Sequence, residues 1–581
     1  MSFKCRGLPI LSYMKILKLL VIFLLPFFVA AQTRYDVVID EIMADQTPAV
    51  SLPSNEWIEL KNVSANPINL LNWRIGDATG QSGPMPVFIL QPDSFVIVCT
   101  GSAVAAMQAY GRVISVTSFP SLDNDGDQLF LKSNTGMVIH AVNYSSSWYQ
   151  NAVKKDGGWT LEMIDTKSPC AGMSNWKASV DIRGGSPGTK NSIDAVNIDL
   201  TGPSLKKAFP VDNMNIMAEF DEPLDSLKGA TLANYSIDGG LLILSATSIS
   251  PFFNQVQLRL QNPMQANTIY NLTVNNVTDC KNNPIGSANK SRVGLPVDAA
   301  AAELVINEIL FNPVSGGSDF VEFYNRSNKI FDANKLYIAN RNSSNAVSSA
   351  KLLASSPFLV FPGDYLVVTE NADNLSLNFF VKNPDAVFII SSMPSFPDDK
   401  GNVILLNFQG NITDEVSYNK SWHFALLDDE NGVSLERIDP DGPSQEATNW
   451  HSAASTAGYG TPTYKNSQYK SVQRINATIE ATPKVFSPDN DGRDDIVSIQ
   501  YKTTEPGYVA NITIFDSNGR PVKTLVSNGI LGLEGYWNWD GLDNKKMKLP
   551  VGTYVVLAEI FNLQGKKEIF KNVVVLARKL N

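Results

Sequence analysis

The sequence is poor in the side chains that carry most enzyme chemistry. It has only 3 histidines among 581 residues, at His140, His423 and His451. None stands in a metal-binding spacing such as His-Glu-x-x-His, so we expect each on a strand face or in a loop. A Gly-x-Ser-x-Gly nucleophile elbow and a glycine-rich phosphate loop are also missing. These absences predict a chain that is not an enzyme.

Positive charge is also scarce, since charged residues make up 18% of the chain and the formal net charge is -10. Nucleic-acid binding needs dense Lys and Arg, which release counterions from phosphate, and no such run occurs. We therefore expect no nucleic-acid partner. Hydrophobic residues reach 44%, and the length is several times that of a typical domain, so the chain can bury several cores.

A long apolar run occurs only near the N-terminus. Lys15 and Lys18 precede the apolar stretch 19–29, and Ala30-Ala31 follows it. This pattern predicts a signal peptide over residues 1–31, cleaved before Gln32; the alternative is an uncleaved anchor. The run is shorter than the about 20 residues of a spanning helix, so we expect no transmembrane segment in the mature chain.

Cysteines are few. Cys5 would leave with the signal peptide, and Cys99, Cys170 and Cys280 remain. An odd number in an oxidising compartment leaves at least one unpaired. Cys99 ends the apolar stretch 95–99 and is expected to be a small core residue. A Cys99–Cys170 disulfide is open at this point, because pairing cannot be deduced from sequence.

Short β-branched and aromatic runs bounded by Gly, Pro, Asn and Asp clusters predict an all-β fold of tandem Ig-like sandwiches. Examples are residues 95–98, 365–368 and 554–557. One short helix is expected over residues 102–110, where Ala, Met and Gln favour it.

The chain repeats itself. Matching segments are 38–42 and 305–309, 56–60 and 319–323, 161–165 and 435–439, Asn175-Trp176 and Asn449-Trp450, and 185–187 and 460–462. These motifs resemble the lamin-tail domain, an Ig-like β-sandwich of nuclear lamins and many exported bacterial proteins. The resemblance implies one copy over 32–193 and another over 303–467. In the second copy, residues 396–401 replace the acidic turn 122–127, so an activity of that turn would belong to the first copy alone.

Between the copies, residues 197–296 resemble a bacterial Ig-like module of surface-layer proteins. The resemblance rests on the segments 220–225, 233–237, 270–274 and 277–283. Exposed linkers are expected at 191–199 and 297–302.

The C-terminal residues 471–581 resemble the Ig-like domain of the flagellar hook-capping protein, as reused in proteins exported by type IX secretion. The matching motifs are Trp539-Asp540-Gly541 and Gly552-Thr553-Tyr554, with strand-like runs at 512–516 and 522–526. The last strand, expected over 571–580, is either a sorting signal read by the secretion machinery or simply the closing strand of a sandwich.

Glutamates recur in both copies at Glu41, Glu59, Glu308 and Glu322. They could be acid/base pairs, but nothing nearby activates a nucleophile. Their place beside core strand residues favours a structural hydrogen-bonding role.

Two acidic loops place oxygen ligands on alternate residues, as Ca²⁺ requires. The better candidate is Asp489, Asp491 and Asp495, and the weaker one is Asp123, Asp125 and Asp127. Neither has the twelfth-position Glu of an EF-hand, so a solvated Asp-Gly turn is the alternative for both. No other cofactor is expected.

Aromatic side chains could form a carbohydrate platform. The candidates are Trp148, Tyr149, Trp422 and Tyr459, although such residues also fill sandwich cores.

Together these features predict a non-catalytic, secreted or cell-surface scaffold or adhesin-like protein of a Gram-negative bacterium. The alternatives are the accessory portion of an exported hydrolase or nuclease system and a polysaccharide-binding protein. The partner would be an unidentified surface protein or polysaccharide.

Overall fold

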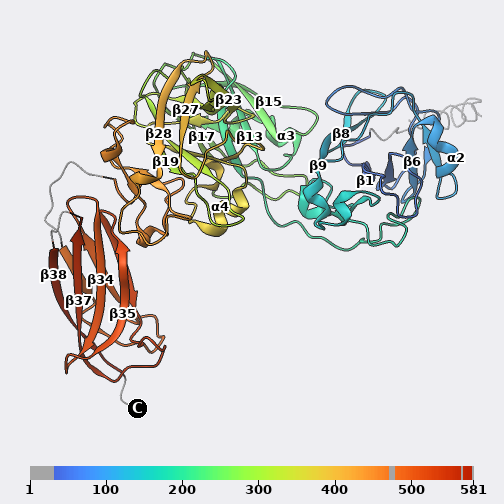
Figure 1. The fold of residues 1–581 in the computed structure, drawn as a ribbon. Coiled ribbons are helices and arrows are strands. Elements are labelled where there is room, and N and C mark those ends of the chain that lie inside the picture. The colour runs from blue at the N-terminus through green and yellow to red at the C-terminus, as the bar shows by residue number, and fades with distance from the viewer. Residues whose placement is uncertain (1–31, 470–477, 564–566, 579–581) are drawn as a thin grey trace, which may run out of the picture.

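The fold is described from a computed structural model, over residues 32–469, 478–563 and 567–578. Its β-rich modules follow one another along the chain (Figure 1). The Ig-like module and the second repeat pack together in the middle, with the first repeat at one end and the C-terminal module at the other. The predicted signal peptide lies outside the described residues.

Helices are few and short among the described residues: α2 (Val104–Met107), α3 (Ser226–Gly229) and α4 (Ala372–Asn378). Helix α2, with the 3-10 turn Gly101–Ala103 before it, confirms the helix expected over 102–110. Among the described residues, no helix has the length and apolar character needed to span a membrane.

The first repeat is a β-sandwich. Its strands are β1 (Val37–Met43), β2 (Trp57–Asn62), β3 (Ile68–Asn69), β4 (Arg74–Gly76), β5 (Ile89–Leu90), β6 (Phe95–Cys99), β7 (Val113–Ser115), β8 (Gly126–Lys132), β9 (Val138–Ser145), β10 (Leu161–Met163) and β11 (Trp176–Ala178). A six-stranded sheet in the order β11-β10-β1-β2-β6-β7 accompanies smaller sheets β4-β8-β9 and β3-β5. Trp73 and Trp176 are buried in the core between them.

The second repeat has the same main sheet. Its strands are β19 (Leu304–Leu310), β20 (Phe320–Asn325), β21 (Phe331–Asp332), β22 (Leu336–Arg341), β23 (Val347–Leu352), β24 (Leu359–Val360), β25 (Tyr365–Thr369), β26 (Val387–Ile389), β27 (Lys400–Asn407), β28 (Ile412–Asn419), β29 (Leu435–Arg437) and β30 (Trp450–Ser452). The order is β26-β25-β20-β19-β29-β30, opposite β23-β22-β27-β28. The register shifts between Ile306 and Glu308, as it does between Ile39 and Glu41, so the copies share even their bulge.

The Ig-like module consists of β12 (Leu205–Pro210), β13 (Asn215–Phe220), β14 (Tyr235–Ile237), β15 (Ile243–Ser248), β16 (Gln255–Leu260), β17 (Tyr270–Val274) and β18 (Lys290–Val293). The sheets β12-β13-β16-β15 and β14-β17-β18 enclose its core. Alternating burial along β13 and β16 gives each strand one core face.

The C-terminal module consists of β31 (Thr478–Thr482), β32 (Val485–Phe486), β33 (Val497–Lys502), β34 (Tyr508–Asp516), β35 (Pro521–Ile530), β36 (Glu534–Trp539), β37 (Gly552–Asn562) and β38 (Lys567–Leu576). They form sheets β31-β33-β36 and β32-β38-β37-β34-β35. Trp539 and Tyr554, from the two turn motifs, lie in the core with ring centroids 5.3 Å apart. The expected closing strand is β38, while Lys579 and Leu580 lie outside the described residues.

Cys170 and Cys280 form a disulfide, with Cα atoms 6.1 Å apart. The open Cys99–Cys170 pairing is therefore wrong. Cys99 is free and buried, as expected of a core residue, because β6 points it toward Trp57 and Met107. Cys170 lies instead on a loop that meets the Ig-like module.

One expected linker is wrong. Ala299 is buried in the core of the second repeat, and Val297 packs against that core. The amide of Asn407 also donates to the carbonyl of Ala299, at 3.1 Å. The segment 297–302 is therefore anchored to the second repeat at Val297 and Ala299 rather than being a free linker, although its other four residues are exposed.

Limited elastase digestion should cut the other expected linker, near its end, because elastase cleaves after small aliphatic residues, which both expected linkers contain. Val196, Ile198 and Leu200 are 82%, 71% and 81% exposed, and exposed loops are preferred cleavage sites. The Cys170–Cys280 disulfide bridges this segment, so the two fragments should separate on a gel only after reduction. Early cutting within 297–302 would contradict the packing described for that segment.

Candidate functional site

Both repeats bury a row of three glutamates on neighbouring strands of the main sheet. In the first repeat Glu41 of β1 lies opposite Glu59 of β2 and Glu162 of β10. In the second, Glu308 of β19 lies opposite Glu322 of β20 and Glu436 of β29. All six side chains are 0% exposed. The third glutamate of each row, Glu162 or Glu436, is not among the glutamates expected from the sequence, although residues 161–165 and 435–439 belong to the repeated pattern.

In the first repeat the glutamates hold the segment that follows β11. The backbone N–H of Ser186 donates to Glu41 at 2.7 Å, and that of Gly188 donates to Glu59 at 2.5 Å. The Ser186 and Ser192 hydroxyls each donate to Glu162 at 2.8 Å.

The second repeat builds the same clamp with threonines. The backbone N–H of Thr461 donates to Glu308 at 2.8 Å, and that of Thr463 donates to Glu322 at 2.6 Å. The Thr461 hydroxyl donates to Glu436 at 2.9 Å. The repeated Gly-x-Pro motif therefore marks where the chain crosses the buried carboxylates.

Burial governs the protonation of these groups. Desolvation raises the pKa of Glu308 to about 8 and raises the pKa of Glu436. Neighbouring Glu41 adds to the desolvation that raises the pKa of Glu59. Perturbed carboxyls can mark active sites, but here burial and hydrogen bonds to the closing segment leave no open face for a substrate. The arrangement fits the structural role.

The two clamps differ at the bulge residue, which is Asn307 in the second repeat and Asp40 in the first. The Asn307 amide donates to Glu322 at 2.8 Å and to the side-chain oxygen of Asn466 at 2.7 Å. Asp40 replaces this amide with a carboxyl. Within the described part of the chain, one side-chain oxygen each of Asp40, Glu59 and Asn191 is buried without a hydrogen-bond partner.

Asp40→Asn should stabilise the first repeat at pH 8 by about 1–3 kcal/mol, because the amide supplies the missing donors. Burial raises the pKa of Asp40 from 3.8 to about 7, against the opposing charge of Lys61. The folded state therefore holds a proton that the unfolded state releases. The contribution of Asp40 to wild-type stability is full below pH 4 and is lost as the pH rises through 7. Calorimetric melts of both proteins between pH 4 and 8 measure this difference.

The reciprocal change Asn307→Asp is the matched control and should destabilise the second repeat. An Asp40→Asn protein that melts like the wild type at every pH would contradict this account of the bulge.

A second difference between the repeats concerns a buried charge. The Arg437 guanidinium lies 3.1 Å from the Asp414 carboxylate, and the two side chains are 1% and 8% exposed. Asp414 also accepts from the backbone N–H of Ile306 at 2.8 Å. In the first repeat His140 Nδ1 accepts from the N–H of Ile39 at 2.9 Å, and Met163 stands in the position of Arg437. The first repeat thus makes the same backbone contact without an ion pair.

All three histidines are packed within the repeats, as expected. His140 lies in β9 and His451 in β30, and the His423 ring contacts the Ser452 hydroxyl at 2.9 Å. Burial lowers the pKa of His140 to about 3 and of His423 to about 4, so both are neutral at physiological pH.

The structure brings Asp489, Asp491 and Asp495 together, with carboxylate oxygens within 4.8 Å of one another. Asp495 accepts from the backbone N–H of Asn490 at 2.6 Å and of Gly492 at 2.8 Å, which folds the loop around it. The other acidic loop, Asp123 to Asp127, forms no such three-carboxylate group among the described residues. The assignment of Ca²⁺ to the first loop stays a prediction.

Calorimetric titration with Ca²⁺ should detect binding that Asp491→Ala removes, because hard cations prefer clustered carboxylates. At 100 times the dissociation constant, the ion should stabilise the C-terminal module by about 2.7 kcal/mol. Asp125→Ala, in the other acidic loop, is the control and should bind as the wild type does. Absence of binding heat in the wild type would show that the Asp489 to Asp495 loop is a solvated Asp-Gly turn and not a Ca²⁺ site.

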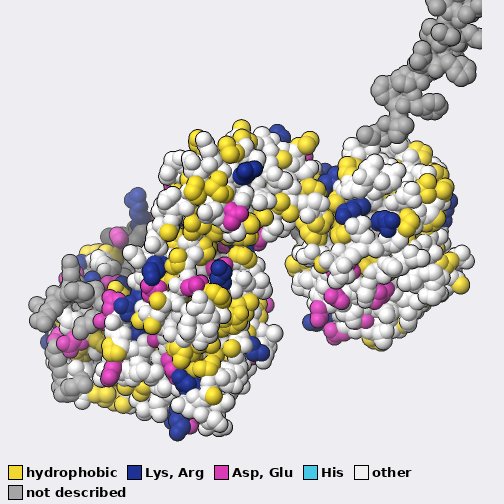
Figure 2. Space-filling view, turned by 90° about the horizontal axis from the view of Figure 1, so that it is seen from above, with side chains coloured by type: hydrophobic (Ala, Val, Ile, Leu, Met, Phe, Trp, Pro, Cys, Tyr) yellow, Lys and Arg dark blue, Asp and Glu magenta, His cyan; other side chains and the backbone are white. Residues whose placement is uncertain are grey.

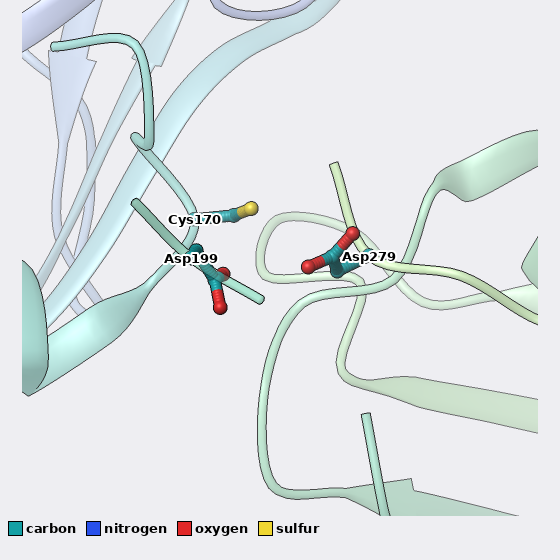
Figure 3. A group of neighbouring side chains, drawn as sticks. All are labelled: Cys170, Asp199 and Asp279. Carbon is teal, nitrogen blue, oxygen red and sulfur yellow. The ribbon is translucent and has the colours of Figure 1, made fainter. Parts of the chain in front are cut away.

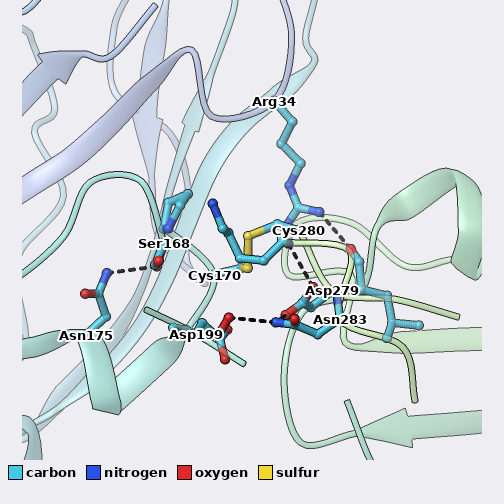
Figure 4. Close-up of a disulfide and its surroundings, with 12 residues drawn as sticks. Arg34, Ser168, Cys170, Asn175, Asp199, Asp279, Cys280 and Asn283 are labelled. Carbon is cyan, nitrogen blue, oxygen red and sulfur yellow. Dashed lines mark hydrogen bonds between the residues drawn. A yellow bond between two sulfur atoms is a disulfide. The ribbon is translucent and has the colours of Figure 1, made fainter. Parts of the chain in front are cut away.

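A second group that could resemble a metal site is Cys170, Asp199 and Asp279 (Figure 3). The Cys170 sulfur is bonded to Cys280 (Figure 4), so it is not a thiolate ligand. Asp279 accepts from the Asn283 amide at 2.8 Å, and the same amide donates to the backbone carbonyl of Asp199 at 3.1 Å. The group is a polar seam between two modules.

The aromatic candidates differ in burial: one is buried in a core, and the other three are half-buried. Tyr149 is buried in the core of the first repeat, so its expected place on a binding platform is wrong. Trp148 and Trp422, in the 3-10 turns Ser146–Tyr149 and Lys420–Trp422, are half-buried. Each packs on a core tryptophan, Trp176 or Trp450, at 6.2 and 6.4 Å between ring centroids. Tyr459 is half-buried as well.

Comparison with known families agrees with the repeats. The Lamin Tail Domain model matches residues 30–146 and 298–420, and the CHU_C type IX secretion signal domain model matches residues 480–576. The chain contains two lamin-tail domain regions and a C-terminal type IX secretion signal domain. Its C-terminal secretion signal domain makes it a secreted or cell-surface protein and implies contact with the secretion machinery. The Ig-like assignment of residues 197–296 and the domain boundaries stay predictions.

No curated protein matches the chain. Among solved structures, the N-terminal part of the bacterial S-layer protein SbsC aligns at 11% identity and TM-score 0.16, over 29% of this chain and 40% of that chain. A tetra-tandem repeat from the extending region of a large adhesion protein aligns at 11% identity and TM-score 0.12, over 93% of this chain and 98% of that one. A DUF4876 family protein from Bacteroides thetaiotaomicron aligns at 14% identity and TM-score 0.18, over 36% and 85%. These scores are too low to support an argument.

The surface agrees with the charge pattern. Figure 2 shows Lys and Arg scattered over the visible face without a dense basic patch.

Proposed function

We propose that this protein is a non-catalytic surface scaffold of adhesin type, exported by a Gram-negative bacterium, whose modules form a stiff row. The observation that carries the proposal is that the chain joins successive modules by packed and bonded junctions. Flexible relative motion is the default between domains unless the interface is large and apolar.

The first junction combines the Cys170–Cys280 disulfide with Arg34. The guanidinium of Arg34 donates to the carbonyl of Leu224 at 3.1 Å and lies 4.2 Å from the centroid of the Phe253 ring. A covalent bond and a buried cation therefore fix the first repeat against the Ig-like module.

The second junction is a shared core. Ile330, Leu359 and Phe361 of the second repeat lie in the hydrophobic cluster of the Ig-like module. At the edge of this cluster, Arg292 pairs with Asp364 at 2.8 Å. Apolar area shared in this way opposes hinge motion, since opening the hinge would expose it to water.

The third junction joins the second repeat to the C-terminal module. Phe424 packs with Val509 and Ile530 in one cluster. The backbone N–H of Leu533 donates to the carbonyl of Ser467 at 2.9 Å, and the hydroxyls of Thr456 and Tyr501 lie 2.7 Å apart. If these contacts persist during export, the C-terminal secretion signal domain would leave the cell as one packed unit with the second repeat.

The rival function is the accessory portion of an exported hydrolase or nuclease. Purified protein should show no turnover of nucleic acid, polypeptide or polysaccharide above background, because the buried glutamates have no open face. Turnover that Glu322→Gln abolishes, in a variant that still melts cooperatively, would overturn the proposal. Turnover that survives Glu322→Gln would indicate a catalytic site elsewhere in the chain, and this result would also overturn the proposal.

A further inference from the structure

A groove of about 540 Å³ lies between the first repeat and the Ig-like module. Its first wall is apolar and aromatic. Trp148 is half-buried there beside Met173, which is 47% exposed. The ring of Trp148 is braced from behind by the buried Trp176. Phe252 and Pro251 of the Ig-like module complete the apolar surface.

The polar side chains that line the groove include amides and carboxyls. They supply the amides of Gln128, Asn143 and Asn254 and the carboxyls of Asp221 and Glu222, and no Lys, Arg or His of the described chain lines the groove. Amides both donate and accept hydrogen bonds, which suits a ligand rich in hydroxyls.

The acidic end of the groove is crowded. Burial, followed by the charges of Asp279 and Asp199, raises the pKa of Glu222 to about 8. A cation placed here would favour the ionised form of Glu222 and so lower its pKa. Charge complementarity therefore favours a ligand with positive groups and disfavours a polyanion.

The groove is also preformed. Cys170 lines it, and its bond to Cys280 ties the two walls together. Walls that are already fixed lower the ordering cost of binding.

We propose that this groove binds a polysaccharide strand that carries free amino groups. The apolar faces of the sugar rings would pack on Trp148, the amides would bond the hydroxyls, and the ammonium groups would pair with Asp221 and Glu222. This goes beyond the scaffold role and does not depend on it, since a scaffold without a sugar site remains a scaffold.

Calorimetry of the full mature chain with three hexasaccharides tests the proposal. The glucosamine hexamer, with free amines, should bind at least about tenfold more tightly than the N-acetylglucosamine hexamer. The galacturonic acid hexamer should not bind. Trp148→Ala should weaken glucosamine-hexamer binding by about tenfold or more. Glu222→Gln, which keeps the side-chain shape and does not threaten the core, should weaken it by several-fold.

Trp422→Ala is the matched control, because Trp422 stacks on Trp450 in the second repeat and does not line the groove. It should leave binding unchanged. Hexalysine binding as tightly as the glucosamine hexamer would mean a general cation surface and would overturn the proposal. So would absence of binding by all three sugars, or binding that Glu222→Gln and Trp148→Ala leave intact.

Discussion

Arg437→Met should lower the free energy of unfolding of the second repeat by about 3–5 kcal/mol. The substitution removes the partner of a carboxylate that is 8% exposed and leaves Asp414 charged in the core. It also frees the carbonyls of Ile306 and Gly442, which Arg437 contacts at 2.9 and 2.8 Å. Scanning calorimetry of the full chain should show one transition shifted to lower temperature.

The first repeat provides the control. The double change Asp414→His with Arg437→Met copies its neutral His140 and Met163 pair, and should recover most of the lost stability. Buried ion pairs often cost as much in desolvation as they return. A single variant that melts within a degree of the wild type would contradict the assigned ion pair, and so would a double variant no more stable than the single.

Cys280→Ser should cost about 4–5 kcal/mol in the chain-entropy picture, because the disulfide closes a loop with a sequence separation of 110 residues. The first repeat and the Ig-like module should then melt earlier and as separate transitions. Calorimetry with and without reductant measures the effect.

Cys99→Ala is the comparison, since Cys99 is free and buried. It should leave the two modules melting together, with a cost limited to a small cavity. Peptide mapping under non-reducing conditions that finds Cys99 in a disulfide would contradict the assignment.

Much of the fold could be predicted because its signals are local. Runs such as residues 95–98 carry their own strand propensity, and the repeated Glu-Ile and Gly-x-Pro motifs mark fixed places in a sandwich. The structural role of Glu41 and Glu308 followed from their position beside core residues. Cys99 was expected in the core for the same reason.

What escaped prediction is non-local. The Cys170–Cys280 bond depends on two modules meeting, which no spacing in the sequence encodes. Ala299 reads as part of an Ala-rich linker, yet tertiary packing buries it. Tyr149 and Trp148 are adjacent aromatics, and only the turn that carries them decides which enters the core and which lines a groove.

Attachment of native-host cells to a glass surface free of polysaccharide tests the scaffold proposal most directly, because this readout does not depend on the sugar groove. A strain lacking this chain should attach poorly, and the wild-type chain should restore attachment. The doubly substituted Glu59→Gln, Glu322→Gln chain should restore it too, provided that surface labelling finds it displayed. Attachment that needs neither the chain nor its display would contradict the account, as would loss of attachment in the displayed glutamine variant.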